Sequence, residues 1–473
     1  MAKRSCNDCR KRDAIIAALQ QRVAELEARL GMNSSNSSLP PSQNPPDAPP
    51  PVTKTPSGRK PGAQPGHPGP VLLRVPPQRL TTVVPFVPTT CQRCHAPLPT
   101  EASPADPEPT WHQVAELPPQ VVHVTEYQGH ARTCCQCGTL NRAAIPADIR
   151  AYRFGPRLTA ALSYLSGCHH VSRRGIEEVV ETVLDFPVSL GTICRLEQET
   201  SQALQGAHAE AVQAVRQAAV KHVDETAWKK AGQRCWLWAA ATARVAAFVL
   251  YAGRGAAGLT TLLGTTIHGI ICSDRWSVYQ GVAVAYRQLC WAHLKRDFQA
   301  MVDRGNSGSA VGTDLLLLTD VVFAWWYRVR DGTLRRQTLQ RRVEQVRKDF
   351  RAVLGAGAAC ACAKTAGTCR ELLAVEEALW TFVRVEGVEP TNNHAERMLR
   401  PAVLWRKNSF GCQSESGCRF VERMLTVVQT LRLGKRQVLA YLHEAIAAHR
   451  AGLPTPKFCL LYTSDAADDL TRV

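Results

Sequence analysis

The clearest alternation of apolar and polar positions lies in residues 220–290, where short apolar runs are separated by turn residues. The runs are rich in branched and aromatic side chains, which favour strands. They predict five strands, at residues 221–228, 235–241, 245–251, 266–272 and 286–290. The small-residue stretch 258–266 predicts a crossover helix, so this part of the chain is expected to form a mixed α/β sheet.

Helical spacing of apolar residues is found on both sides of this sheet. Residues 152–202 predict two helices that are broken at Phe186-Pro187 and capped at their N-termini by Ser172 and Ser189. A helix-turn-helix and a plain helical hairpin both fit this pattern. Residues 298–388 are mostly helical and predict an insertion in the domain that contains this sheet.

The N-terminal pattern predicts a short coiled coil. Its a/d positions are Ile16, Leu19, Val23, Leu26 and Leu30. About two heptads make a marginal helix, so self-association and packing against the same chain both remain open. The residues that follow, 33–72, are rich in proline and serine and predict an extended basic linker.

Composition favours a polyanionic partner, because 57 Lys and Arg against 40 Asp and Glu leave a formal charge of +17. The start of the chain has no apolar segment typical of a secretory signal, and no uncharged apolar run is long enough to predict a membrane span. We therefore expect a cytoplasmic protein whose cysteines stay reduced.

Two C-x-x-C pairs within residues 73–150 predict a zinc ribbon. They are Cys91 with Cys94 and Cys134 with Cys137. Four thiolates on two hairpin tips suit tetrahedral Zn²⁺ in a structural role. The gap between the pairs is longer than usual, and Cys135 offers a competing ligand.

Three acids carry the candidate chemistry. Asp224 lies on the first predicted strand, Asp274 follows the fourth, and Glu396 lies on a helix over 393–400 that Asn392 or Asn393 can cap. Pro401 is expected to kink or restart this helix. Glu225 points to the opposite face from Asp224, so it is expected to be dispensable. Cations beside the third acid suit a phosphate backbone: Arg397, Arg400, Arg406 and Lys407.

Four sequence blocks carry a resemblance to a known family: HVDETAWK, ICSDRWSVY, LCWAHLKRDF and EPTNNHAERMLRPAVLWRKNSFG. They resemble the signature blocks of insertion sequence 66 family transposases, and the resemblance covers nearly all of residues 10–455. It implies a DDE-type transposase with a ribonuclease H-like fold, in which strands one and four are neighbours. The implied catalytic acids are Asp224, Asp274 and Glu396. Ser273 departs from the family, which more often has His there.

The resemblance also implies a mechanism and partners. Carboxylates at a nucleic-acid site suit two Mg²⁺ (or Mn²⁺) ions. Water cleaves the element's end, and the freed 3′-hydroxyl then attacks target DNA. Expected partners are double-stranded DNA at the element ends and target, a second copy of the chain and accessory proteins of the same element, at the nucleoid and with no membrane. Arg173 and Arg174 are further expected DNA contacts. A catalytically inactive zinc-ribbon DNA-binding protein and a nuclease without strand transfer remain alternatives.

These interpretations divide the chain into seven parts. The expected parts are a coiled coil (1–32), a linker (33–72), a zinc ribbon (73–150), a helix-turn-helix-like region (151–212), a catalytic domain (213–411) with its insertion at about 298–388, a C-terminal helical region (412–456) and a tail (459–473). The tail contains CLLYTSDAADD, which resembles translated read-through of a sequencing-library adapter. We therefore expect it to carry no biological role.

Overall fold

The computed structural model describes residues 15–23, 27, 32–33, 37, 74–101, 103–104, 106–110, 112–115, 117, 122–137 and 139–458. Contacts divide the chain into two units, residues 1–49 with 125–473 and residues 50–124, and each is described by itself. Residues 15–23 are helical and exposed. The seam positions Leu26 and Leu30, nearly all of the linker and the tail lie outside the described residues.

The centre of the larger unit is a five-stranded mixed sheet with the order β5-β4-β3-β6-β7. Antiparallel pairing joins the first three strands, and parallel pairing joins β3 to β6 and β6 to β7. The mixed sheet is confirmed, with its first and fourth strands adjacent. The strand bounds are β3 Val220–Lys230, β4 Gln233–Ala241, β5 Ala246–Tyr251, β6 Ile270–Ser273 and β7 Arg287–Leu289.

Strand β6 begins four residues later than the alternation predicts, because of a close backbone approach at Gly269. This residue has φ +68°, and a Cβ there would lie 2.4 Å from the carbonyl oxygen of Ala219. Only glycine fits such a position without strain. The chain therefore turns at Gly269 and pairs as a strand only from Ile270 onward.

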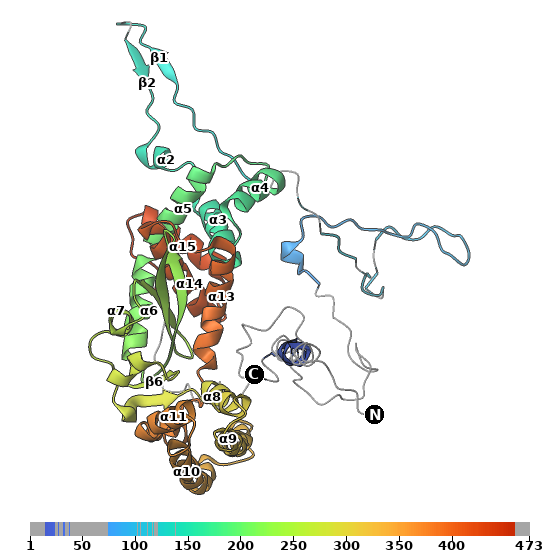
Figure 1. Ribbon diagram of the computed structural model, residues 1–473. Coiled ribbons are helices and arrows are strands. Elements are labelled where there is room, and N and C mark those ends of the chain that lie inside the picture. The colour runs from blue at the N-terminus through green and yellow to red at the C-terminus, as the bar shows by residue number, and fades with distance from the viewer. Residues whose placement is uncertain are drawn as a thin grey trace, which may run out of the picture. The chain divides into compact units, whose positions relative to one another are not determined.

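Helices cover both faces of the sheet (Figure 1). Helix α13 (Asn393–Ser409) packs on the face of β3 that carries Asp224 and Thr226, where Arg406 reaches Thr226. Helix α7 (Ala256–Leu263) packs on the other face, with Gly258 directly against the ring of Trp238. Since Trp238 pairs with Glu225 and Ala239 pairs with Asp224, the two acids of the Asp-Glu pair face different layers.

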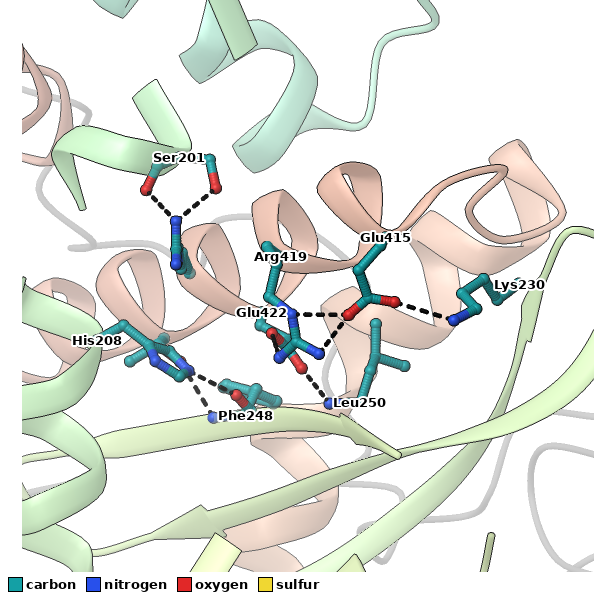
Figure 2. A network of polar contacts seen from close by, with 10 residues as sticks. Ser201, His208, Lys230, Phe248, Leu250, Glu415, Arg419 and Glu422 are labelled. Atoms are coloured by element: carbon teal, nitrogen blue, oxygen red, sulfur yellow. Dashed lines mark hydrogen bonds and ion pairs between the residues drawn. The ribbon is translucent and has the colours of Figure 1, made fainter. Parts of the chain in front are cut away.

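Helix α14 (Glu415–Leu433) covers the free edge of β5 (Figure 2). Oxygens of Glu422, Thr426 and Thr430 accept hydrogen bonds from the backbone N–H groups of Leu250, Phe248 and Ala246 over 2.5, 3.0 and 3.2 Å. Four helical residues rise about 6 Å and two strand residues about 7 Å, so this spacing matches every second edge N–H group. The match satisfies an edge that would otherwise be open to pairing.

The helical segment predicted over residues 298–388 is found, and its first helix, α8, starts seven residues before the expected boundary. Its core surrounds Trp291, Phe350 and Trp380 and includes Ile270 and Leu289 of the sheet, so it packs on β6 and β7. The bounds are α8 Trp291–Asp303, α9 Ser309–Arg330, α10 Arg336–Ala358, α11 Ala363–Ala374, η5 Glu376–Leu379 and α12 Thr381–Arg384.

Among the described helices, α9 is the one long and apolar enough to cross a membrane by composition. Its Leu315 and Val322 are buried in the core of the insertion. The apolar composition of α9 is therefore also that of a helix in the core of a protein, and it is weak evidence for a membrane span.

The predicted helices over 152–202 are found, with both serine caps. Ser172 accepts from the N–H of Gly175 and Ser189 from that of Thr192. The remaining bounds are η2 Pro77–Arg79, β1 Ala131–Thr133, β2 Leu140–Arg142, α2 Ala147–Ala151, α3 Pro156–His169, α4 Arg173–Val183, α5 Leu190–Ala203, α6 Gln205–Gln217, η3 Ser277–Gly281, η4 Val284–Tyr286 and α15 Val438–Arg450.

Candidate functional site

The parallel pairing of β3 with β6 brings the first two acids together. Each paired β3 residue lies opposite the residue 50 positions further along the chain, as Val220 lies opposite Ile270 and His222 opposite Cys272. The same offset, carried two residues further, places Asp224 level with Asp274. Parallel strands end at the same sheet edge, so both carboxylates lie at the carboxyl end of this strand pair.

Asp224 lies among several other carboxylates, and this affects its pKa. Burial raises its pKa well above the ordinary value, and the nearby carboxylates of Glu225, Asp274 and Glu396 raise the pKa further. Asp224 Oδ1 accepts from the N–H of Glu225, and Asp274 Oδ1 accepts from that of Trp276, each over 2.9 Å. Each acid is thus oriented by one backbone donor.

Glu396 lies in the first turn of α13, which continues without a restart through Pro401 to Ser409. Of the two expectations for Pro401, a kink or a restart, the restart is wrong. Glu396 Oε1 lies 3.7 Å from Nδ1 of His293 on α8. Burial lowers the pKa of His293, which favours the neutral imidazole. The first helix of the insertion and the helix that follows the insertion therefore meet at the third acid.

Asn392 is the N-cap residue of α13, but its side chain does not cap the helix. Its Nδ2 donates to the carbonyl of Val223 over 2.8 Å, and its Oδ1 lies 3.2 Å from His222 Nδ1. The backbone N–H of Asn392 donates to Cys290 Sγ over 3.0 Å. The predicted cap is therefore replaced by a link between the start of α13 and two other segments, which helical spacing alone could not reveal.

The donor set fits divalent metal by its chemistry, since three carboxylates offer hard oxygen ligands and a cation would relieve the repulsion at Asp224. Among the residues that the structure describes, however, no three His, Cys, Asp or Glu side chains converge closely enough to hold one ion. Asp224 and Asp274 follow the paired residues of β3 and β6, and Asp274 and Glu396 both raise the pKa of Asp224, but the three acids do not form a preformed metal site.

Glu225 points to the opposite face of the sheet from Asp224, as the two-residue period of a strand predicts. It is nevertheless buried and makes specific contacts. Its side chain is 1% exposed and pairs with Arg254 over 2.8 Å. It also accepts from the hydroxyl of Tyr279 over 2.8 Å. Loss of this carboxylate would leave a partly buried cation and a buried hydroxyl without their partner. Its predicted dispensability therefore conflicts with these contacts.

The predicted phosphate-binding cations fall into two groups. Arg397, Arg400 and Lys407 form an exposed stripe along α13, and Arg174 is also exposed. Arg406 instead donates to Thr226 Oγ1 on β3 over 3.1 Å. Arg173 donates twice to Glu197 Oε2, over 2.8 and 2.7 Å. The guanidinium groups of Arg406 and Arg173 are thus already engaged within the protein.

Each C-x-x-C pair forms the same kind of turn. The N–H of Cys91 donates to the carbonyl of Ala96, and that of Cys134 donates to the carbonyl of Thr139, each over 2.9 Å and five residues along the chain. The pKa of Cys91 is lowered chiefly by backbone hydrogen bonding at Cys94. The pKa of Cys137 is lowered chiefly by its hydrogen bond with the Thr139 side chain. Both turns therefore favour the thiolate, and they belong to different units of the chain.

Comparison with known proteins shows that the residues of this site lie within a stretch that matches a protein family. The model of the IS66 family of transposases matches residues 151–419, more than half of the chain. A family of unknown function (DUF6444) matches residues 9–71. The uncharacterized protein y4qI of Sinorhizobium fredii (strain NBRC 101917 / NGR234) is 28% identical over 251 residues, covering 46% of this chain and 44% of that protein.

The chain thus spans less than half the length of that relative. The matched residues include the whole five-stranded sheet, the helical insertion and the three candidate acids. On the strength of this match, the chain belongs to the IS66 family of transposases.

Proposed function

We propose that this transposase is a DDE-type enzyme that cuts element ends and joins them to target DNA. The sheet and the insertion correspond in this proposal to a ribonuclease H-like catalytic domain. The observation that carries it is the 50-residue register of β3 and β6, because it sets Asp224 beside Asp274 on the face that α13 covers. Glu396 lies in the first turn of that helix, near enough to raise the pKa of Asp224, which supports its part as the third acid.

Each acid has a defined part in this proposal. Asp224, Asp274 and Glu396 would hold two Mg²⁺ or Mn²⁺ ions. When bound, the ions supply activation of the attacking oxygen and stabilisation of the leaving oxygen. Asp224 and Asp274 are kept in orientation by the N–H groups of Glu225 and Trp276. The exposed stripe of Arg397, Arg400 and Lys407 would bind the phosphates that flank the scissile bond.

The decisive test is cleavage and joining of labelled element-end DNA in Mg²⁺ or Mn²⁺. Asp224→Asn, Asp274→Asn and Glu396→Gln should each abolish both reactions and leave DNA binding intact. Glu415→Gln is the matched control, since this glutamate pairs with Lys230 and Arg419 at the start of α14. Full activity in the Glu396 variant and loss in the Glu415 variant would reassign the third acid. Cleavage without joining would instead identify a nuclease, and binding without cleavage an inactive DNA-binding protein.

The other parts of the proposal concern assembly and place. The two cysteine turns would hold one structural Zn²⁺, and the N-terminal helix would pair copies of the chain on DNA as a coiled coil. Helices α4 and α5 would act as a helix-turn-helix-like element that presents Arg174 to DNA. Such an enzyme works at the nucleoid in the cytoplasm, with accessory proteins of the same element as further partners.

A further inference from the structure

Trp276 lies beside the candidate acids and is 39% exposed. Its backbone N–H donates to Asp274 Oδ1 over 2.9 Å, so the indole and the carboxylate belong to one tight turn. Two residues of chain span at most about 7 Å, which is about two base steps of DNA at about 3.4 Å each. The separation of the two residues is therefore comparable to the spacing between a phosphate and a nearby base on one DNA strand.

One face of the Trp276 indole is already covered by Arg254. The guanidinium carbon lies 4.0 Å from the ring centroid of Trp276 and 4.7 Å from that of Trp236. Arg234 contacts the same Trp236 ring at 4.9 Å. Cation–π contacts of this kind hold the planar groups in a fixed stack. Trp276 forms one end of that stack, two residues after Asp274, and Arg234 forms the other; both are exposed.

Glu225 fixes the guanidinium behind the ring. The Nε and one terminal nitrogen of Arg254 both lie 2.8 Å from Glu225 Oε1. Tyr279, three residues after Trp276, donates to the other oxygen of the same carboxylate over 2.8 Å. Arg254 is therefore not free to swing toward a phosphate, and its part is to support the indole. A ring held in this way loses little freedom when it binds.

We propose that Trp276 is a stacking platform for an unstacked DNA base next to the phosphate that Asp274 approaches. Paired bases inside a duplex have both faces covered, so an indole face selects a terminal or extruded base. Such a contact would set the base beside the scissile bond and would favour ends that open easily. This inference rests on one part of the proposed function, namely that DNA binds at the candidate acids.

The test uses the full-length chain and end DNA of its own element, with 2-aminopurine at each of the last three positions of either strand. Ca²⁺ replaces Mg²⁺ so that the DNA stays intact. Wild type should change the fluorescence at one position. Trp276→Leu should lose this change and bind about 5- to 100-fold more weakly, as expected for the loss of one base–aromatic stack. Trp276→Phe should restore the change.

Tyr327→Leu serves as the matched control, because Tyr327 is an aromatic residue on α9 that is 57% exposed. This variant should behave as wild type. Leucine at 276 still covers Arg254, so a folded variant is expected, and an unchanged melting temperature checks it. Wild-type fluorescence in Trp276→Leu would overturn the proposal, as would loss of the signal in Trp276→Phe. A wild type that shows the signal but never cuts DNA would refute the proposed reaction and leave the platform standing.

Discussion

The side-chain amide of Asn392 donates to the backbone carbonyl of Val223, the residue before Asp224, over 2.8 Å. One asparagine thus joins the helix that carries Glu396 to the strand that carries Asp224. Its Oδ1 accepts from Nδ1 of His222 over 3.2 Å, which fixes the histidine tautomer. Burial lowers the pKa of His222 to about 4, so this ring stays neutral at pH 7 and the link does not titrate there.

Replacing Asn392 should weaken the positioning of Glu396 relative to Asp224 without removing either carboxylate. Asn392→Ala leaves the buried His222 donor and the Val223 carbonyl unpaired, at about 1–3 kcal/mol for each unpaired group. We expect a lower kcat for end cleavage and a higher Mg²⁺ requirement, with DNA affinity little changed. Asn393→Ala is the neighbouring control, since Asn393 is exposed. Equal kcat and Mg²⁺ dependence in the two variants would show that Asn392 does not position the site.

The Glu422 contact on the edge of β5 predicts a pH-dependent stability. Burial raises the pKa of Glu422 from 4.5 to about 7, so the folded chain binds this proton more tightly than the unfolded chain. The stabilisation is fully present below pH 4.5 and is lost as the pH rises through about 7. At about 1.4 kcal/mol per pKa unit, the total is at most about 3.5 kcal/mol.

Glu422→Gln should remove this dependence, because an amide oxygen can still accept from Leu250 without titrating. Urea unfolding between pH 4.5 and 8 should therefore give a difference between variant and wild type that grows in favour of the variant as the pH rises. Other titrating groups contribute equally to both proteins and cancel in the difference. A constant difference across this range would mean that Glu422 is ionised throughout.

Zinc content tests the cysteine turns. Purified wild type should contain about one Zn²⁺ per chain, and the double variant Cys94→Ser with Cys137→Ser should contain none. Cys135→Ser is the control, since Cys135 is exposed between the two outer cysteines of its own turn. Wild-type zinc in the double variant would refute the site, and loss in the Cys135 variant would reassign the ligands.

Self-association tests the N-terminal seam. Ile16, Leu19 and Val23 are each more than half exposed, so an unpaired helix would leave apolar surface in water. Leu19→Lys should shift sedimentation toward the monomer. Ala17→Lys adds the same charge off the seam and should not. An unchanged distribution for Leu19→Lys would mean that these residues do not hold copies together.

The sheet and the insertion could be predicted because their signals are local. The alternation around Val223 and the serine caps at Ser172 and Ser189 depend on residues within one element. The two-residue period of a strand also predicted that Asp224 and Glu225 point to different faces of the sheet. The resemblance supplied the pairing of the first and fourth strands, which no local pattern contains.

Long-range side-chain contacts were not predictable in this way. Asn392 has the composition of a helix cap, yet His222 and Val223 compete for its side chain from a strand 170 positions away. Pro401 is accommodated inside α13, where packing of Leu399 and Ala402 outweighs the lost hydrogen bond. The stack on Arg254 joins residues of three separate segments, and only Trp276 gave a local hint through its position beside Asp274.

The cover that α14 gives to β5 has a consequence for defective copies of the gene. A frameshift or stop codon after α13 would leave all three acids encoded but would expose the N–H groups of Ala246, Phe248 and Leu250. An uncovered edge strand pairs readily with other chains. The truncated proteins made from such copies should aggregate and be removed by proteolysis. They could therefore not compete with the intact enzyme for element ends.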